Sequence, residues 1–419
     1  MKKRIIGIIA LTLVAVLVVG IIYFEIEPEN TNINYEPADL HKETDTTIRF
    51  NSDGKLKILH IADTHLNYDK HFDASIWVIA EACDVEKPDL VVLTGDNTHP
   101  DEDPEKTKKL INALMNIFES RSIPVAVTFG NHDAEKGPMT RRDIMEYYET
   151  FSCVISIDDS EGFKNCATFN IPVLASDSDK VNFNLWVFDS GDYDEDEPRH
   201  YDRVRTEQID WYKKTSAKLK KENGGETVNS VVFQHIIVPE IYDVLKKVDS
   251  KQPYAIKHIY NEDEYYMFDP DEVNYGMLNE KPCPGYYNDG QFNALVETGD
   301  VLAMFTGHDH TNAFGVRNQN IDIYTSPMTR YKGLAYTTQY GYRVVEIDEN
   351  DTSTYETRVE RLYDVFDFDY IKVAKDNGDK YSTRIAFELA VKGTVQEGFM
   401  RLYQSVVELI TGRQVTYPD

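Results

Sequence analysis

From Lys55 onward, short apolar runs alternate with stretches of helical periodicity. Each run has the length of a strand, is rich in aliphatic and β-branched residues, and ends in polar residues. Near-continuous apolar strands separated by amphipathic helices are typical of a sheet that is buried on both faces, so the pattern predicts a layered α/β domain. The predicted strands are 56–63, 89–96, 124–133, 184–192, 229–235 and 301–310, and the predicted helices are 74–86, 104–121 and 206–223.

The second half of the chain departs from this alternation. Three further predicted strands, 321–326, 342–348 and 354–362, follow one another without helices, which indicates antiparallel closure of a second sheet. Residues 239–290 are charged and rich in tyrosine. We interpret them as a long insertion loop whose tyrosines either stack on a nucleobase or pack the loop itself. Residues 363–419 predict a C-terminal helical appendage, either an extra helical pair on the core or a surface for a partner.

The N-terminus carries a membrane signal. Residues 1–4 are basic and residues 5–24 contain no charge, a run long enough as a helix to cross about 30 Å of hydrocarbon. Basic residues favour the cytoplasmic side, so we expect a single-pass transmembrane anchor in the cell membrane, with the rest of the chain extracytoplasmic. Cleavage as a signal peptide, giving a secreted protein, is the alternative. Residues 25–54 predict an acidic polar linker to a domain that spans residues 55–362.

Charge limits the partners of the protein. The 419 residues include 44 Lys and Arg against 72 Asp and Glu, a formal net charge of -28. Binding of nucleic acid needs a basic face that displaces counterions, so no nucleic acid is expected as a partner. The sequence leaves the oligomeric state open. Four cysteines are too few for a disulfide scaffold and lack the spacing of a structural zinc site.

Polar clusters lie at the carboxyl ends of five of the predicted strands. The carboxyl ends of strands in an α/β sheet border one crevice, where ligands bind, so we expect these side chains to converge. Imidazole, carboxylate and amide groups form a ligand set that suits Zn²⁺, Mn²⁺ or iron. The clusters are Asp63-x-His65, Gly95-Asp96-Asn97, Gly130-Asn131-His132-Asp133, His235 and Gly307-His308-Asp309-His310.

Spacing refines this hypothesis. Residues two apart in an extended segment share a face, so Asp63 lies beside His65, and His308 lies beside His310. The two oxygens of the Asp96 carboxylate can bridge two cations about 3.5–4 Å apart. A single aspartate or histidine after a strand is more often a turn residue or a cap, so the prediction depends on all five clusters occurring together.

In their order along the chain, the five clusters resemble the motif series of calcineurin-like metallophosphoesterases, over residues 55–362. The Asp189–Tyr193 stretch, the Gln208-x-x-Trp211 pair and residues 307–315 are most similar to the purple-acid-phosphatase-like branch. The resemblance implies an α/β fold of the metallophosphatase type, a four-layer α/β/β/α sandwich behind the N-terminal transmembrane helix.

The resemblance also implies a role for each motif residue. It places one metal ion on Asp63, His65, Asp96 and His310, and a second on Asp96, Asn131, His235 and His308. It makes His132 the non-ligating histidine that faces the scissile ester, and Asp133 the carboxylate that orients this histidine. The implied cofactors are two divalent or mixed-valence ions of Fe, Mn or Zn.

The implied function is hydrolysis of a small phosphoester substrate outside the membrane. A hydroxide that bridges the two ions would attack phosphorus, while His132 assists the leaving group. Two alternatives stay open. One is a phosphodiesterase or nucleotidase that acts on nucleotides or lipid head groups, and the other is a catalytically silent surface binding protein of the same fold.

Overall fold

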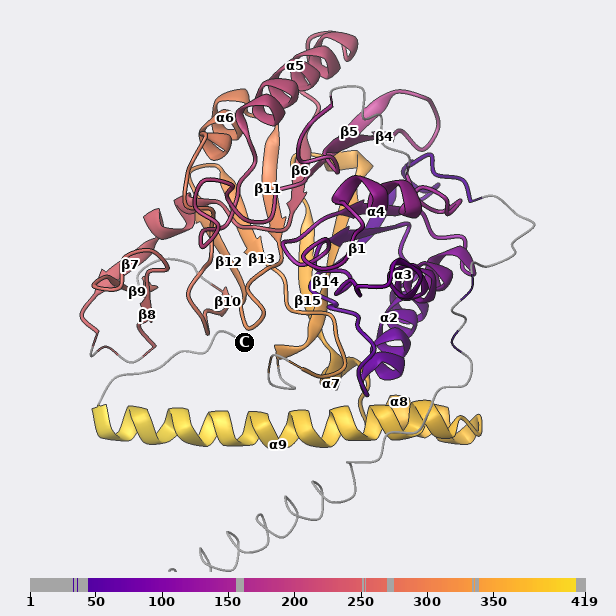
Figure 1. Cartoon of the computed structure of the whole chain (residues 1–419), viewed down its shortest axis with the longest axis vertical. Helices are drawn as coiled ribbons and strands as arrows, with labels where there is room; N and C mark the ends of the chain where they lie inside the picture. Colours follow the sequence, from indigo (N-terminus) through magenta and orange to yellow (C-terminus); the bar gives the residue numbers. More distant parts are fainter. Residues whose placement is uncertain are drawn as a thin grey trace, which may run out of the picture.

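Two β-sheets packed face to face form the centre of the computed structural model (Figure 1). The five-stranded sheet has the order β15 (Glu356–Arg361), β14 (Gly341–Asp348), β1 (Lys55–Ile61), β2 (Leu90–Thr94), β3 (Val125–Thr128). The seven-stranded sheet has the order β10 (Tyr275–Met277), β12 (Ala313–Asn318), β13 (Ile321–Thr325), β11 (Val301–Thr306), β6 (Ser230–Gln234), β5 (Val181–Phe188), β4 (Phe169–Leu174). The structure describes residues 33, 36, 44–155, 162–250, 252, 254–269, 275–333, 335 and 339–411.

Alternating side chains of the strands divide the interior into three cores. Ile58 of β1 and Phe233 of β6 point into the core between the two sheets. Leu59, the next residue of β1, points to the opposite face, where the helices α2 (Phe72–Glu86) and α3 (Pro104–Glu119) cover the five-stranded sheet. Val232 points to the outer face of the seven-stranded sheet, under α5 (Thr206–Glu222) and α6 (Gln291–Thr298). The predicted four-layer α/β/β/α arrangement is therefore confirmed.

The prediction that residues 342–348 and 354–362 close the second sheet was wrong. Strand β14 pairs with β1 antiparallel, and β15 pairs with β14, so both strands extend the first sheet. The register explains this choice, because Val345 lies opposite Ile58 and faces the same core between the sheets. Only β13, which is parallel to β11 and antiparallel to β12, belongs to the second sheet, as predicted.

The insertion at residues 239–290 contains more regular structure than the loop that was predicted. It begins with a 3₁₀ helix, η1 (Pro239–Asp243). The strands β7 (Leu245–Val248), β9 (Tyr265–Phe268) and β8 (Ile256–Lys257) then form a small antiparallel sheet in that order. The last strand, β10, joins the edge of the seven-stranded sheet next to β12. The insertion is thus anchored on the main domain.

The C-terminal appendage packs on the domain at its beginning. It consists of α7 (Leu362–Val365), α8 (Phe368–Asp376) and the long helix α9 (Lys380–Thr411), which lies across one end of the molecule (Figure 1). Trp77 of α2 donates a hydrogen bond of 2.8 Å to Ser382, and Leu389 belongs to the core beneath α2. These contacts favour the extra-helix interpretation for the first half of α9.

The predicted anchor, residues 5–24, lies outside the described residues, as does most of the predicted linker. Within the part of the chain that the structure describes, no helix combines the length and the apolar composition needed to cross a membrane. The end of the predicted linker belongs to the domain, because Ile48 and Phe50 are buried in the core between the sheets.

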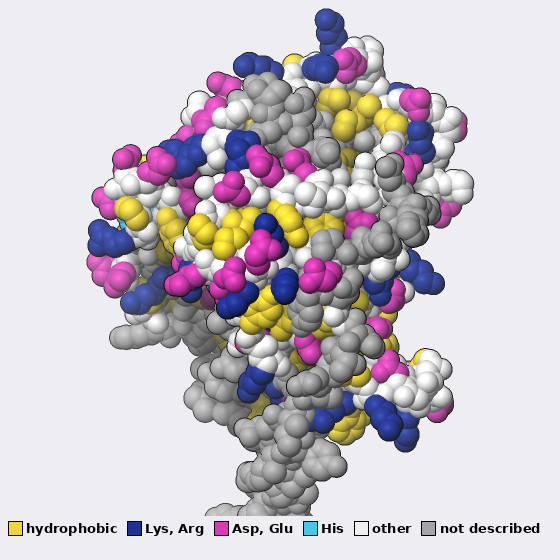
Figure 2. Space-filling view, turned by 45° about the vertical axis from the view of Figure 1, so that its right-hand side comes forward, with side chains coloured by type: hydrophobic (Ala, Val, Ile, Leu, Met, Phe, Trp, Pro, Cys, Tyr) yellow, Lys and Arg dark blue, Asp and Glu magenta, His cyan; other side chains and the backbone are white. Residues whose placement is uncertain are grey.

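On the face drawn in Figure 2, acidic side chains are interspersed with lysines and arginines.

Candidate metal centre

The structure brings together all seven residues predicted as metal ligands. Each lies in a loop that directly follows a strand, at the edge where the carboxyl ends of both sheets meet. The five-stranded sheet contributes Asp63 and His65 after β1, Asp96 after β2 and Asn131 after β3. The seven-stranded sheet contributes His235 after β6, and His308 and His310 after β11.

Four of these ligand candidates have an unusual backbone conformation. The φ angles of Asp63, His65, Asp96 and His308 are 55°, 42°, 50° and 73°, in the left-handed region. Aspartate and histidine tolerate this region better than most residues, but it still costs about 1–3 kcal/mol at each position. Such strain persists only where the surroundings fix the chain, so these loops are held in place by their contacts.

The glycines of the motifs permit those contacts. A Cβ atom on Gly95 would lie 2.1 Å from the backbone nitrogen of Gly130, and one on Gly130 would lie 2.2 Å from Oδ1 of Asp96. A Cβ atom on Gly307 would lie 2.6 Å from Oδ2 of Asp63. No side chain fits at such distances, so glycine is required wherever two ligand loops approach each other.

Asp133 fastens two of the ligand loops to each other. Its buried carboxylate accepts hydrogen bonds from the backbone nitrogens of Gly130 (2.7 Å), Asp96 (2.7 Å), Asn97 (2.9 Å) and Thr98 (3.2 Å). These four bonds connect the loop after β2 with the loop after β3. Asp133 therefore supports the site through the backbone.

The His132 ring has a different partner from the one predicted. Its Nδ1 lies 2.7 Å from Oε2 of Glu135, whereas Asp133 contacts backbone amides. The role predicted for Asp133, orientation of the His132 ring, thus falls to Glu135. The reason is the tight turn at residues 130–133, which directs the Asp133 side chain inward. The backbone nitrogen of His132 donates to Oδ1 of Asp96 at 2.8 Å, and a quarter of its side chain, 25%, is exposed at the mouth of the site.

The first group of ligand candidates consists of Asp63, His65, Asp96 and His310, whose ligand atoms lie within 4.8 Å of one another. Nε2 of His65 is 2.9 Å from Nε2 of His310 and 3.4 Å from Oδ2 of Asp96. Oδ1 of Asp63 is 3.6 Å from Nε2 of His310. These distances suit atoms that surround a common cation.

The second group consists of Asp96, His235 and His308, with Asn131 beside them. Nε2 of His235 lies 3.4 Å from Oδ2 of Asp96, 3.3 Å from Oδ1 of Asn131 and 3.2 Å from Nδ1 of His308. Nδ1 of His235 is hydrogen-bonded to the carbonyl oxygen of Thr94 at 2.9 Å, which leaves Nε2 as the nitrogen that faces the group. Oδ2 of Asp96 is therefore 3.4 Å from a histidine nitrogen in each group.

Two buried carboxylate oxygens that accept no hydrogen bond from any residue that the structure describes indicate that the site fits two cations. Oδ1 of Asp63 and Oδ2 of Asp96 are fully buried and have no hydrogen-bond partner among the described residues. A buried carboxylate oxygen without a partner is costly, and a metal ion removes this cost. Four imidazole or carboxylate groups around the first position and three around the second match the coordination of zinc, manganese or iron.

The protonation states of three ligand histidines agree with this fit, whereas burial of His235 is outweighed by the carboxylates of Asp96 and Asp63, which raise its pKa to about 9 in the protein alone. Burial lowers the pKa of His65 and His308 well below the ordinary value and lowers that of His310 to about 4, so all three rings are neutral at pH 7, the form that binds metal. Burial, opposed by His235 and reinforced by Asp96, raises the pKa of Asp63 to about 7 in the protein alone. Burial also disfavours the charge of Asp96, but His235 and His65 outweigh it and hold the pKa well below its usual range.

Sequence reasoning missed His99, which lies directly behind the first group. Its Nε2 is 2.8 Å from Nδ1 of His65, and its ring lies 4.8 Å from that of His132, measured between centroids. The signal in the sequence was a histidine three residues after Asp96, in the same loop. For Arg330 the sequence favoured a surface role over contact with a substrate phosphate, but its guanidinium is buried and donates to the carbonyl oxygen of His65 at 2.6 Å.

Comparisons with known proteins agree with this site. The model of the family described as calcineurin-like phosphoesterase matches residues 56–312, which include all five motifs. Probable inactive purple acid phosphatase 14 of Arabidopsis thaliana is 29% identical over 339 residues, 71% of this chain and 77% of that protein. Probable inactive purple acid phosphatase 29 of the same plant is 28% identical over 298 residues, 64% of this chain and 70% of that protein.

Among solved structures, a dimetal phosphatase from Danio rerio is similar over 73% of this chain and 98% of its own, with 11% identity and a TM-score of 0.46. The family model covers more than half of the present chain, and the curated relatives carry the name of the branch that the motifs resemble. The chain therefore belongs to the calcineurin-like phosphoesterase family, in its purple-acid-phosphatase-like branch.

Proposed function

We propose that this protein hydrolyses small phosphoesters with the help of two bound metal ions. The observation that carries the proposal is the position of Asp96. Its buried Oδ2, which has no hydrogen-bond partner among the described residues, lies 3.4 Å from Nε2 of His65 in one group and 3.4 Å from Nε2 of His235 in the other. A carboxylate shared in this way is the arrangement that holds two cations close enough to act on one phosphate.

The chemistry divides between the ions and the protein. Two divalent cations supply Lewis-acid charge to the phosphoryl oxygens and make water more acidic. The protein holds the ligands rigidly, since Asp133 bonds four backbone amides of the loops after β2 and β3. The side chains of Asp63 and His235 are fully buried, so bulk water does not reach them. Charge interactions are stronger where water is excluded.

His132 is placed to protonate the leaving group. Its Nδ1 is engaged by Glu135 at 2.7 Å, so Nε2 is the ring nitrogen that can meet an ester oxygen. The ring is partly exposed at the mouth of the site, whereas the ligand side chains of Asp63 and His235 are buried. Donation of a proton by Nε2 to the departing oxygen would release the alcohol, and Glu135 keeps the ring oriented during this transfer.

Metal analysis combined with two chromogenic substrates tests the proposal. The purified protein is loaded with Zn²⁺, Mn²⁺ or Fe²⁺ and assayed with p-nitrophenyl phosphate and bis-p-nitrophenyl phosphate. Turnover of the first indicates a phosphomonoesterase, and turnover of the second indicates the phosphodiesterase alternative. If fewer than two ions bind per chain and neither substrate turns over, the proposed function is wrong.

A second candidate is a metal-binding protein without turnover. It is favoured by the names of two relatives, which call those proteins probable inactive purple acid phosphatases. The present chain nevertheless combines seven ligand candidates with a histidine at the mouth of the site. Two bound ions per chain without hydrolysis of either chromogenic substrate would decide for this candidate.

The location of the protein is part of the proposal. The basic residues 1–4 and the uncharged residues 5–24 support a single-pass anchor, with the hydrolase domain on the extracytoplasmic side. Fractionation of cells that express the full chain, followed by protease treatment of intact cells, tests this location. Recovery of the full-length protein in the soluble cytoplasmic fraction would contradict it.

A further inference from the structure

A series of aromatic rings, in two groups linked through the backbone of Tyr201, leads away from the metal centre. It begins at two ligand candidates: Nδ2 of Asn131 donates to the hydroxyl of Tyr193 at 3.1 Å, and the rings of Tyr201 and His308 form a T-shaped pair with centroids 4.3 Å apart. Tyr193 and Tyr201 stack on each other with centroids 5.7 Å apart. Both are half-buried, so they form the inner end of the series.

The series continues to the protein surface through the insertion. The backbone nitrogen of Tyr286 donates to the carbonyl oxygen of Tyr201 at 3.2 Å, and the Tyr286 ring stacks on His200 with centroids 3.9 Å apart. Tyr260 and Tyr287 each form a T-shaped pair with Tyr286, with centroids 4.9 Å and 5.0 Å apart. The outer rings are solvent-accessible, since Tyr286 is 45% exposed and Tyr287 is 41% exposed.

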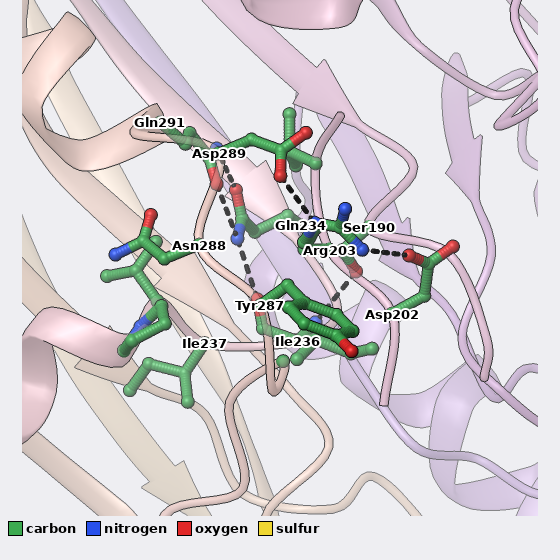
Figure 3. Close-up of a pocket in the computed structure, with 14 residues that line it drawn as sticks. Ser190, Asp202, Arg203, Gln234, Ile236, Ile237, Tyr287, Asn288, Asp289 and Gln291 are labelled. Carbon is green, nitrogen blue, oxygen red and sulfur yellow. Dashed lines mark hydrogen bonds and ion pairs between the residues drawn. The ribbon is translucent and has the colours of Figure 1, made fainter. Parts of the chain in front are cut away.

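Ion pairs hold the outer end in place. The Arg203 guanidinium lies 5.1 Å from the centroid of the Tyr287 ring. Arg203 is fixed in turn by ion pairs with Asp289 at 2.6 Å and Asp194 at 2.9 Å. Figure 3 shows Tyr287 beside Arg203 at a small cavity of about 20 Å³, room for a single water molecule. These contacts hold Tyr287 against a fixed guanidinium.

We propose that this series, Tyr193, His200, Tyr201, Tyr260, Tyr286 and Tyr287, binds the base of a nucleoside monophosphate. The inference rests on the proposed function, in which the phosphate sits on the metal centre. A flat π-system stacks on aromatic side chains regardless of its hydrogen-bonding pattern. The accessible rings are separated from the ligands by Tyr193 and Tyr201, so the stacking group must be separated from phosphorus by a spacer, as ribose separates a base.

The charge around the aromatic series favours a substrate with a single phosphate group. The series is bordered by the acidic loop at residues 192–197, whose five carboxylates outnumber the three cations that pair with them, Lys164, Arg199 and Arg203. A second or third phosphate of a nucleotide would meet this acidic border, whereas a neutral base would not. The expected order of preference is AMP over ATP, and AMP over a phosphomonoester without a ring.

Substitution of Tyr286 separates this role from that of the metals. In the metal-loaded full chain, Tyr286→Ala should reduce the ratio of kcat/KM for AMP to kcat/KM for glycerol 2-phosphate by about 10-fold, since a base stacked on one ring contributes about 1–3 kcal/mol. Tyr286→Phe keeps the ring and should retain the ratio. Phe368→Ala on α8, which removes an aromatic side chain that is 59% exposed, is the matched control and should change neither rate constant.

A binding measurement makes the test independent of turnover. The dissociation constants of an adenosine 5′-phosphonate and of methylphosphonate are compared by calorimetry. The adenosine compound should bind at least about 10-fold more tightly, and Tyr286→Ala should remove this advantage.

Equal affinities, or an advantage that survives Tyr286→Ala, would overturn the inference and leave the hydrolase assignment intact. Absence of turnover with all substrates would instead contradict the proposed function.

Discussion

Nδ1 of His65 lies 2.8 Å from Nε2 of His99, and this contact determines which nitrogen of His65 faces the metal centre. In the tautomer in which Nδ1 of His65 carries the proton and donates a hydrogen bond to His99, Nε2 keeps its lone pair. This lone pair points toward Asp96 and His310. His99 therefore acts as a positioning residue for a ligand candidate, a role that outer hydrogen-bond partners fill at many metal sites.

Removal of this partner should weaken metal binding. We expect His99→Ala to lower metal affinity by about 10–100-fold, because the His65 ring loses its preferred tautomer. Titration against a chromogenic chelator measures the change. His99→Gln, which retains an acceptor in the side chain, should restore part of the affinity, whereas equal affinities of the alanine variant and the native protein would refute the positioning role.

Substitution of Asp96 should affect both metal positions at once. Asp96→Asn removes the charge shared by the two groups, and we expect both ions to be lost and kcat/KM to fall by more than about 100-fold, since loss of even an outer partner costs about 10–100-fold. His310→Ala removes a ligand of the first group only and serves as the comparison. Elemental analysis gives the stoichiometry. Near-normal turnover of the Asp96→Asn variant would remove the two-metal mechanism.

Substitution of His132 should slow hydrolysis without removing the metals. His132→Ala eliminates the proton donor, which contributes about 10²–10⁴-fold when the leaving group is poor. The loss should be large for an alkyl phosphate and small for p-nitrophenyl phosphate, whose leaving group needs no proton. Glu135→Gln should also slow the alkyl phosphate more than p-nitrophenyl phosphate, but by a smaller factor. The substitution disturbs only the orientation of the His132 ring, whose Nδ1 lies 2.7 Å from Oε2 of Glu135. Equal losses for both substrates would contradict the proton-donor role.

Substitution of a motif glycine should destabilise the fold as well as the site. A Cβ atom on Gly130 would lie 2.2 Å from Oδ1 of Asp96, so we expect Gly130→Ala to reduce the free energy of unfolding by about 1–3 kcal/mol. Gly398 of α9 has no atom within 4 Å of the added Cβ, and Gly398→Ala should raise the helix stability by up to about 1 kcal/mol. Thermal unfolding of the two variants measures the difference. Equal unfolding temperatures would show that the loops after β2 and β3 can separate.

The architecture and the ligand set could be predicted because they depend on local pattern. Apolar strands that end in Asp, Asn or His identify both the sheets and the crevice between them. The sheet to which β14 belongs could not be predicted in this way. A two-residue period shows which side chains share a face, but the partner at a sheet edge depends on pairing across the whole chain, as between Ile58 and Val345.

The site also contains relationships that spacing does not encode. Asp133 and Glu135 follow His132 by one and three residues, and only the turn conformation decides that Glu135 meets the ring. The strands β7 and β9 of the insertion are short and only partly buried, so their sequence lacks the apolar alternation of the main sheets. Sequence periodicity is informative where burial is deep, and it is weaker where a segment rests on the surface.

The ligand candidates come from two different sheets, and this has a consequence for folding. Asp63, Asp96 and Asn131 follow strands of one sheet, whereas His235 and His308 follow strands of the other. A cation held between them would cross-link the two halves of the sandwich, so its binding free energy would add to the free energy of unfolding. For one site, each tenfold rise in free metal above the dissociation constant would add about 1.4 kcal/mol. The cellular supply of metal would then set how long the folded protein survives, as well as how fast it works.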